Sequence, residues 1–111
     1  MIIKIKESFS SDYISRKAGE VLRNKILTAV ESRTELVLDF EGIVIASTSF
    51  FDEGIAKLGS EISPEMFKKF ITIKNINKND QKVLEQVSSF RKFNMTDSHR
   101  WRICPIGEHW V

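Results

Sequence analysis

Three consecutive hydroxyl side chains, Ser47, Thr48 and Ser49, follow a mostly apolar stretch and precede two acids, Asp52 and Glu53. Where a strand runs into a helix, the strand ends and its side chains meet solvent, so such junctions often carry reactive or recognition groups. Hydroxyls at this position have two common uses. They cap the helix by accepting backbone hydrogen bonds, or they accept a phosphate group that acts as a switch.

Both interpretations stay open for this cluster. As a helix N-cap, Ser49 would have Asp52 three residues later in a capping box, and acids favour the positive end of a helix. Alternatively, Thr48 or Ser49 is phosphorylated, or the cluster binds another anionic group, because helix N-termini attract phosphate. Asp52 and Glu53 lie in the same turn, and we expect them to repel a phosphate. The two uses are compatible, since one hydroxyl can cap while its neighbour stays exposed.

Asp39 is a further candidate, because it lies inside an apolar run. A charged group in such a position needs a partner. We expect its carboxylate to accept hydrogen bonds from a loop backbone or from Arg16. The sequence offers no partner for a metal or acid–base role.

The residue types that bind metals or act as nucleophiles lie mainly near the C-terminus, at His99, Cys104, Glu108 and His109. Their spacing matches no common zinc pattern, and there is only one thiol. The chain has no Gly-x-Ser-x-Gly elbow and no glycine-rich phosphate loop. We therefore expect no enzymatic activity, no metal site and no cofactor.

A basic and aromatic stretch, residues 90–93 and 99–102, suggests an alternative function in nucleic-acid binding. Aromatic side chains can stack on bases while Lys and Arg neutralise the backbone. The structural interpretation is a helix end whose cations face the negative end of the helix, followed by a strand whose Trp101 packs on the core. The net charge of only +2 makes tight nucleic-acid binding the less favoured interpretation.

The composition indicates one globular domain of 111 residues, with 41% hydrophobic and 29% charged residues. The single Cys104 excludes an internal disulfide and is typical of a reducing compartment. No apolar run is long enough to span a bilayer, and the first residues lack the apolar core of a signal peptide. We expect a cytoplasmic protein with no membrane segment. The sequence does not indicate an oligomeric state.

Strands and helices are predicted to alternate along the chain. The hydrophobic pattern predicts strands near residues 3–6, 35–40 and 70–73, and helices over 13–31, from the hydroxyl cluster to Ile62, and over 77–90, with a short helical turn after Pro64. Such alternation is typical of an α/β fold, here a small, mostly parallel sheet with three helices. Residues 94–111 form either a last strand ended by Pro105 plus a tail, or a tail alone.

The stretch from Leu38 to Glu53 resembles the STAS-like domains of the uncharacterised DUF4325 type. Its sharpest motifs are Asp39-Phe40 and Ser49-Phe50-x-Asp52-Glu53. The resemblance covers residues 1–93, which leaves 94–111 as a C-terminal extension. It implies a layered STAS-like domain.

The wider STAS family includes bacterial anti-sigma-factor antagonists, in which a histidine-kinase-like ATPase phosphorylates a serine at this turn and then no longer binds. The resemblance places Thr48 at the phosphorylated position and Ser49 at the serine that follows. Ser47 stands where the antagonists have aspartate, and Phe50 where they have glycine. The resemblance implies a non-enzymatic, regulatory protein-interaction module of bacterial type. Its site would be Ser47, Thr48, Ser49, Asp52 and Glu53, and its partner a histidine-kinase-like ATPase.

Overall fold

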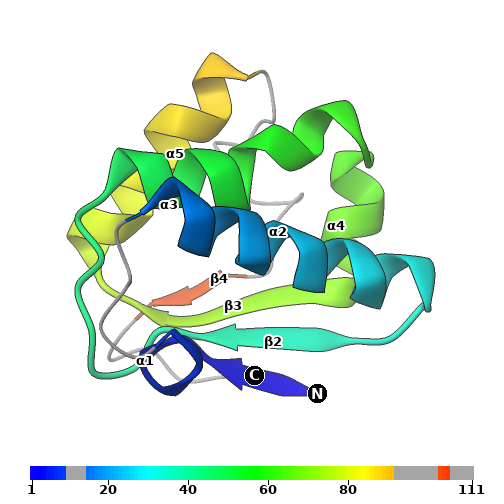
Figure 1. Ribbon diagram of the computed structural model, residues 1–111, viewed down its shortest axis with the longest axis horizontal. Coiled ribbons are helices and arrows are strands. Elements are labelled where there is room, and N and C mark those ends of the chain that lie inside the picture. Colours follow the sequence, from blue (N-terminus) through cyan, green and yellow to red (C-terminus); the bar gives the residue numbers. More distant parts are fainter. Residues whose placement is uncertain (10–14, 92–102, 106–111) are drawn as a thin grey trace.

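A four-stranded parallel sheet forms the base of the molecule (Figure 1). The computed structural model describes residues 1–9 and 15–91, and the backbone of 103–105. The strands are β1 (Ile2–Lys4), β2 (Leu36–Asp39), β3 (Ile71–Ile76) and β4 (Ile103–Pro105). They lie side by side in chain order, and every neighbouring pair is parallel. The predicted α/β class with a small parallel sheet is therefore confirmed.

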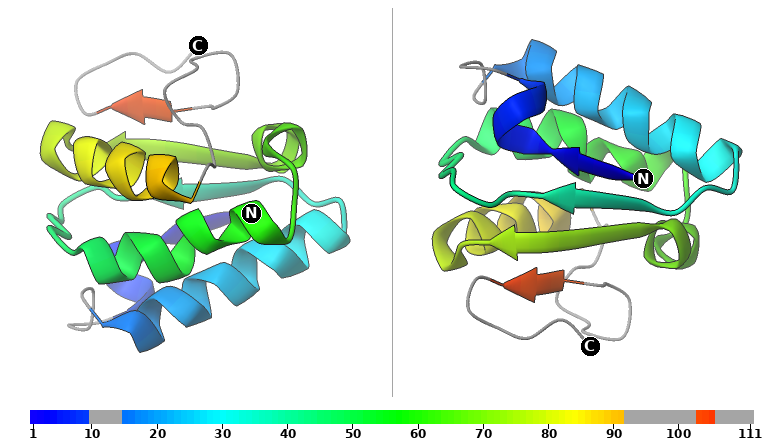
Figure 2. Two further views of the ribbon diagram at one scale, coloured as in Figure 1. Left: turned by 90° about the horizontal axis from the view of Figure 1, so that it is seen from above. Right: turned by 90° about the horizontal axis from the view of Figure 1, so that it is seen from below.

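Helices connect the strands and cover one face of the sheet. They are α1 (Ile5–Ser8), α2 (Arg16–Glu31), α3 (Thr48–Gly54), the 3-10 helix η1 (Ala56–Ser60), α4 (Pro64–Phe70) and α5 (Lys78–Phe90). The view from above has α2, α3 and α5 in front of the strands, and the view from below has the strands in front (Figure 2). Right-handed crossovers between strands added in one direction place successive helices on the same face.

Side-chain caps fix where the helices begin. Ser15 and Asn77 each accept a hydrogen bond from the backbone N–H three residues ahead, at 3.0 and 2.9 Å. Ser63 does the same at 3.2 Å, directly before Pro64. The predicted helix starts at Asn77 and Pro64 are confirmed, whereas the helix expected from residue 13 begins at Arg16.

The core lies between the sheet and the three crossover helices. Its fully buried members from the sheet, from α2 and from the segment of α3 and η1, with Ile55 between them, include Leu36, Leu38, Ile71, Ile73, Leu22, Ile26, Phe50, Phe51, Ile55 and Leu58. Val83 and Val87 of α5 are only partly buried but pack against this core. The spacing of Val83, Val87 and Phe90 predicts one apolar stripe along α5, but Phe90 does not continue it, because its side chain is 86% exposed.

Three boundaries also differ from the sequence prediction. The strand expected over 3–6 ends at Lys4, and the buried Ile5 begins α1 instead. A short apolar run cannot distinguish a strand from a helical turn. The apolar run before the hydroxyl cluster is a strand only as far as Asp39; after a turn at Gly42, whose φ is +80°, it continues as a loop. The second helix divides at Ile55, where φ and ψ leave the helical region.

The end of the chain contributes a strand to the same sheet. β4 pairs in parallel with β3, with Ile103 opposite Ile73. Residues 103–105 thus form a strand, as in the first of the two alternatives for the end of the chain, residues 94–111. The other residues of this extension lie outside the described residues, including His99, Glu108 and His109.

Candidate functional site

The hydroxyl cluster lies at the start of α3, as the sequence predicts, but a different serine caps the helix. Ser47 accepts a hydrogen bond from the backbone N–H of Phe50 at 3.2 Å. The prediction that Ser49 is the N-cap, with Asp52 in a capping box, is therefore wrong. Ser49 lies inside the first turn and is half-buried, whereas Thr48 is exposed.

The loop before the cluster is held by a fully buried carboxylate. Asp80 of α5 accepts hydrogen bonds from the backbone N–H of Ile45 at 2.7 Å and of Ala46 at 2.8 Å. The side-chain amide of Asn77 donates a third, at 2.8 Å. Ala46 has a φ of +50°, a conformation that L-residues rarely adopt. The carboxylate thus holds the backbone immediately before Ser47 in an uncommon conformation.

Asp39 accepts one hydrogen bond from a loop backbone, as expected, and a second from a side chain of β3. Its Oδ1 accepts a hydrogen bond from the backbone N–H of Glu41 at 3.0 Å and another from the side-chain amide of Asn75 at 2.9 Å. The alternative partner named from sequence, Arg16, instead pairs with two other acids. Asp39 thus stabilises the turn after β2.

Helices α2 and α3 cross at very close range. A Cβ placed on Gly19 would lie 2.8 Å from the backbone oxygen of Phe50 and 2.8 Å from the Cβ of Glu53. This crossing therefore requires the absence of a side chain at position 19. It also puts Glu53 against α2, within reach of Arg16 and Arg23.

Glu53 is clamped rather than presented to solvent. Its carboxylate contacts Lys57 at 2.5 Å, Arg16 at 2.9 Å and Arg23 at 3.0 Å. Arg23 also donates to the backbone oxygen of Glu53 at 2.8 Å. The hydrogen bond from Lys57 lowers the pKa of Glu53 most, and Arg23 and Arg16 act in the same direction, against the effect of burial. The carboxylate is thus kept ionised by three cationic side chains, of which Arg16 is shared with Asp52.

Asp52 is paired with cations from two other helices. Arg91, just after the last residue of α5, donates to it through Nε at 2.5 Å and Nη2 at 2.8 Å. Arg16 lies 3.5 Å away. The hydrogen bond from Arg91 is the main cause of the lowered pKa of Asp52, and it raises the pKa of Arg91 in turn. Both acids that were expected to repel a phosphate are therefore paired with cations.

Asp52, Arg16 and Arg91 line a surface cavity of about 400 Å³. We call its lining the α3–α5 surface; it consists of Arg16, Thr48, Asp52, Val87, Phe90 and Arg91. Of the five site residues predicted from sequence, Thr48 and Asp52 belong to it. The other three do not line the cavity. Ser47 caps α3, Ser49 lies in its first turn, and Glu53 forms ion pairs with Arg16, Arg23 and Lys57.

Sequence reasoning missed the contribution of Arg91 to this site. Arg91 is 39 residues from its partner Asp52, and no local spacing links the two. It was assigned to the basic and aromatic stretch of the nucleic-acid alternative, where it was expected to be solvated. Most of that stretch lies outside the described residues, and Arg91 is held by a carboxylate.

The part of the chain that the structure describes contains neither a cluster that could hold a metal ion nor a helix that could span a membrane. No group of three or more His, Cys, Asp or Glu side chains there could hold a metal ion. Within the same residues, no helix is both long enough and apolar enough to cross a membrane.

A comparison with protein-family models matches residues 18–81, more than half of the chain, to a STAS-like domain of unknown function, DUF4325. The chain belongs to this family. The match includes α2 from residue 18 onward, the hydroxyl cluster, Asp52, Glu53 and Asp80, and it leaves out Arg16, Phe90 and Arg91. Comparisons with curated proteins and with solved structures gave no match. The sequence resemblance to DUF4325 is thus confirmed, and the α3–α5 surface lies only partly within the matched region.

Proposed function

We propose that this STAS-like domain is a non-enzymatic protein-interaction module whose partner binds the α3–α5 surface. The observation that carries the proposal is Phe90, which is 86% exposed at the rim of a cavity that also holds Arg16 and Arg91. Aromatic and Arg side chains dominate the binding energy of protein interfaces when a partner desolvates them. An exposed Phe ring beside two oriented guanidinium groups matches that composition.

The proposal includes a switch at Thr48. This hydroxyl is exposed and lines the same cavity as the two arginines. Phosphate on Thr48 would add nearly two negative charges and three strong acceptors. It would compete with Asp52 for Arg91, since guanidinium groups bind phosphate and carboxylate in the same bidentate manner. Phosphorylation would therefore rearrange the surface that the partner contacts.

The partner class follows from the family resemblance. Anti-sigma-factor antagonists of the wider STAS family bind histidine-kinase-like ATPases, and we propose a protein of that class here. Ser47 supports the assignment of the switch to Thr48, because a capping serine has its oxygen engaged by a backbone N–H. Ser49 is the weaker candidate, since it is half-buried in the first turn.

Site-specific photocrosslinking in the native host tests the proposal. A photoreactive phenylalanine analogue replaces Phe90 in one variant and the exposed Glu61, which does not line the α3–α5 surface, in a control variant. We expect one protein to be crosslinked from position 90 and not from position 61, and mass spectrometry to identify it as a histidine-kinase-like ATPase. Equal crosslinking from both positions, or none from position 90, would contradict the assigned surface.

A further inference from the structure

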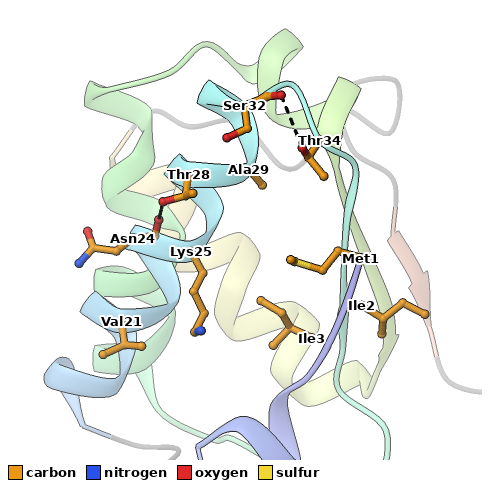
Figure 3. A pocket seen from close by; sticks show the side chains of 10 residues that line it. All are labelled: Met1, Ile2, Ile3, Val21, Asn24, Lys25, Thr28, Ala29, Ser32 and Thr34. Carbon is orange, nitrogen blue, oxygen red and sulfur yellow. Dashed lines mark hydrogen bonds between the residues drawn. The ribbon is translucent and has the colours of Figure 1, made fainter.

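A second open surface lies between α2 and β1, the first strand of the sheet (Figure 3). It is a groove of about 700 Å³, and its lining includes Ile2 and Ile3 on the strand and Val21, Lys25 and Thr28 on the helix. Ile2 is 59% and Val21 42% exposed, whereas Ile3 is buried at the base. None of its lining residues belongs to the α3–α5 surface.

The groove runs along a free strand edge. β1 is the first strand of the sheet and pairs only with β2 among the described residues. Met1 accepts a hydrogen bond from the backbone N–H of Val37 of β2 at 2.9 Å. Backbone groups of a strand alternate in direction, so the N–H and C=O of the next residue, Ile2, are directed away from β2. An edge of this kind can pair with an added strand.

The positive charge of the groove favours an acidic binding partner. Lys25 is its one charged lining side chain, and none of the lining residues is acidic. Within the described residues Lys25 has no carboxylate partner, and its side chain extends from α2 into the gap (Figure 3). A second copy pairing through β1 would bring two Lys25 side chains to one interface without a lining acid to offset them. An acidic segment offers the complementary charge.

We propose that this groove binds an extended segment of a partner protein, which pairs with the β1 edge, places apolar side chains against Ile3 and Val21, and sets a carboxylate beside Lys25. On the helical side the lining extends from Val21 of α2 to Ser32, the residue that follows α2, which at 1.5 Å per residue is roughly 16 Å. An extended chain rises about 3.3 Å per residue, so the groove accommodates about five residues. The module thereby has two binding surfaces and can connect two partners.

Selection from a phage library of random linear 12-residue peptides, with the full chain as target, tests this inference. A synthetic peptide of the enriched consensus is then titrated by fluorescence anisotropy against wild type, Lys25→Glu and the control Lys17→Glu. Lys17 is exposed on the same helix and does not line the groove. We expect a consensus of alternating apolar residues with an acid, at least a tenfold loss of affinity in Lys25→Glu, and less than a twofold change in Lys17→Glu.

Three results would overturn it. The first is a library without enrichment, or with peptides that lack an acid or bind Lys25→Glu as well as wild type. The second is loss of the peptides in Phe90→Ser, which would place them on the α3–α5 surface instead. The third is a dimer in light scattering that Val21→Glu dissociates, which would make a second copy the occupant. Peptide binding that survives Phe90→Ser supports the groove whether or not the proposed function of the α3–α5 surface holds.

Discussion

Replacing Asp80 by asparagine tests how the hydroxyl cluster is positioned. Both carboxylate oxygens of Asp80 are in use: Oδ1 accepts from the N–H of Ala46, and Oδ2 accepts from Ile45 and Asn77. Asparagine has only one acceptor oxygen, so its NH₂ group would face one of these donors. The substitution keeps the size and shape of the side chain and replaces one of its two acceptor oxygens by a donor.

The expected cost follows from the bonds lost. A hydrogen bond to a charged group contributes about 1.5–3 kcal/mol and a neutral one about 0.5–1.5 kcal/mol, and a buried unsatisfied group adds a penalty of similar size. Losing one bond and weakening another should lower the free energy of unfolding by about 2–4 kcal/mol. With a urea m-value of about 1–3 kcal/mol per M, the unfolding midpoint should fall by about 0.7–4 M.

Asp39→Asn is the matched control. Asp39 is also buried and also binds two donors, but both bonds go to the same oxygen, Oδ1. Asparagine can keep both, so this variant should lose less stability than Asp80→Asn. Hydrogen exchange gives a second measurement, in which the amides of Ile45 and Ala46 should exchange faster in Asp80→Asn alone. Equal losses of stability in the two variants, with unchanged exchange, would refute the proposed role of Asp80.

Three further predictions concern α3 and its contacts. Ser47→Ala should lower the free energy of unfolding by about 1 kcal/mol, as for other lost N-caps. The loss should be larger than that in Ser49→Ala. A larger loss in Ser49→Ala, measured in urea melts, would show that Ser49 is the N-cap. Gly19→Ala should destabilise despite the higher helix propensity of alanine, because its Cβ would meet the backbone of α3 at 2.8 Å, and an unchanged or raised melting temperature would contradict the close crossing. The pKa values of Glu53 and Asp52 are lowered from their ordinary values of 4.5 and 3.8. The ion pairs of these two acids therefore contribute fully to the stability of the fold above the ordinary values, and this contribution is lost as the pH falls through the lowered folded-state values. Glu53→Gln should therefore flatten the loss of stability in urea melts below pH 4.5, and an unchanged slope would show that the clamp contributes little.

Elements that depend on nearby residues could be predicted from the sequence. The caps at Ser63 and Asn77 and the apolar positions of α2 lie close to the backbone they affect, so short-range spacing is sufficient. The order of strands and helices then determined the parallel sheet, and the motif around Asp39 and Ser49 indicated the family.

The site itself depends on contacts between distant residues, which spacing does not encode. Three adjacent hydroxyls are equivalent in the sequence, and the fixed loop at Ala46 decides which of them caps α3. That loop is held by Asp80, 34 residues later. In the same way, Arg91 pairs with Asp52 from the end of another helix, so this acid, predicted to repel phosphate, lines a cavity together with two arginines.

The most direct test of the account compares partner affinity with and without phosphate on Thr48. The protein crosslinked from position 90 is titrated calorimetrically with wild type, with protein carrying phosphothreonine at position 48, and with Phe90→Ser. Coupling between a modification and a binding surface is typically about 1–3 kcal/mol, so we expect phosphorylation to weaken binding roughly 5- to 150-fold. Phe90→Ser should weaken it without any phosphate. Equal affinities for all three proteins would contradict the claim that the α3–α5 surface binds the partner and that Thr48 regulates it.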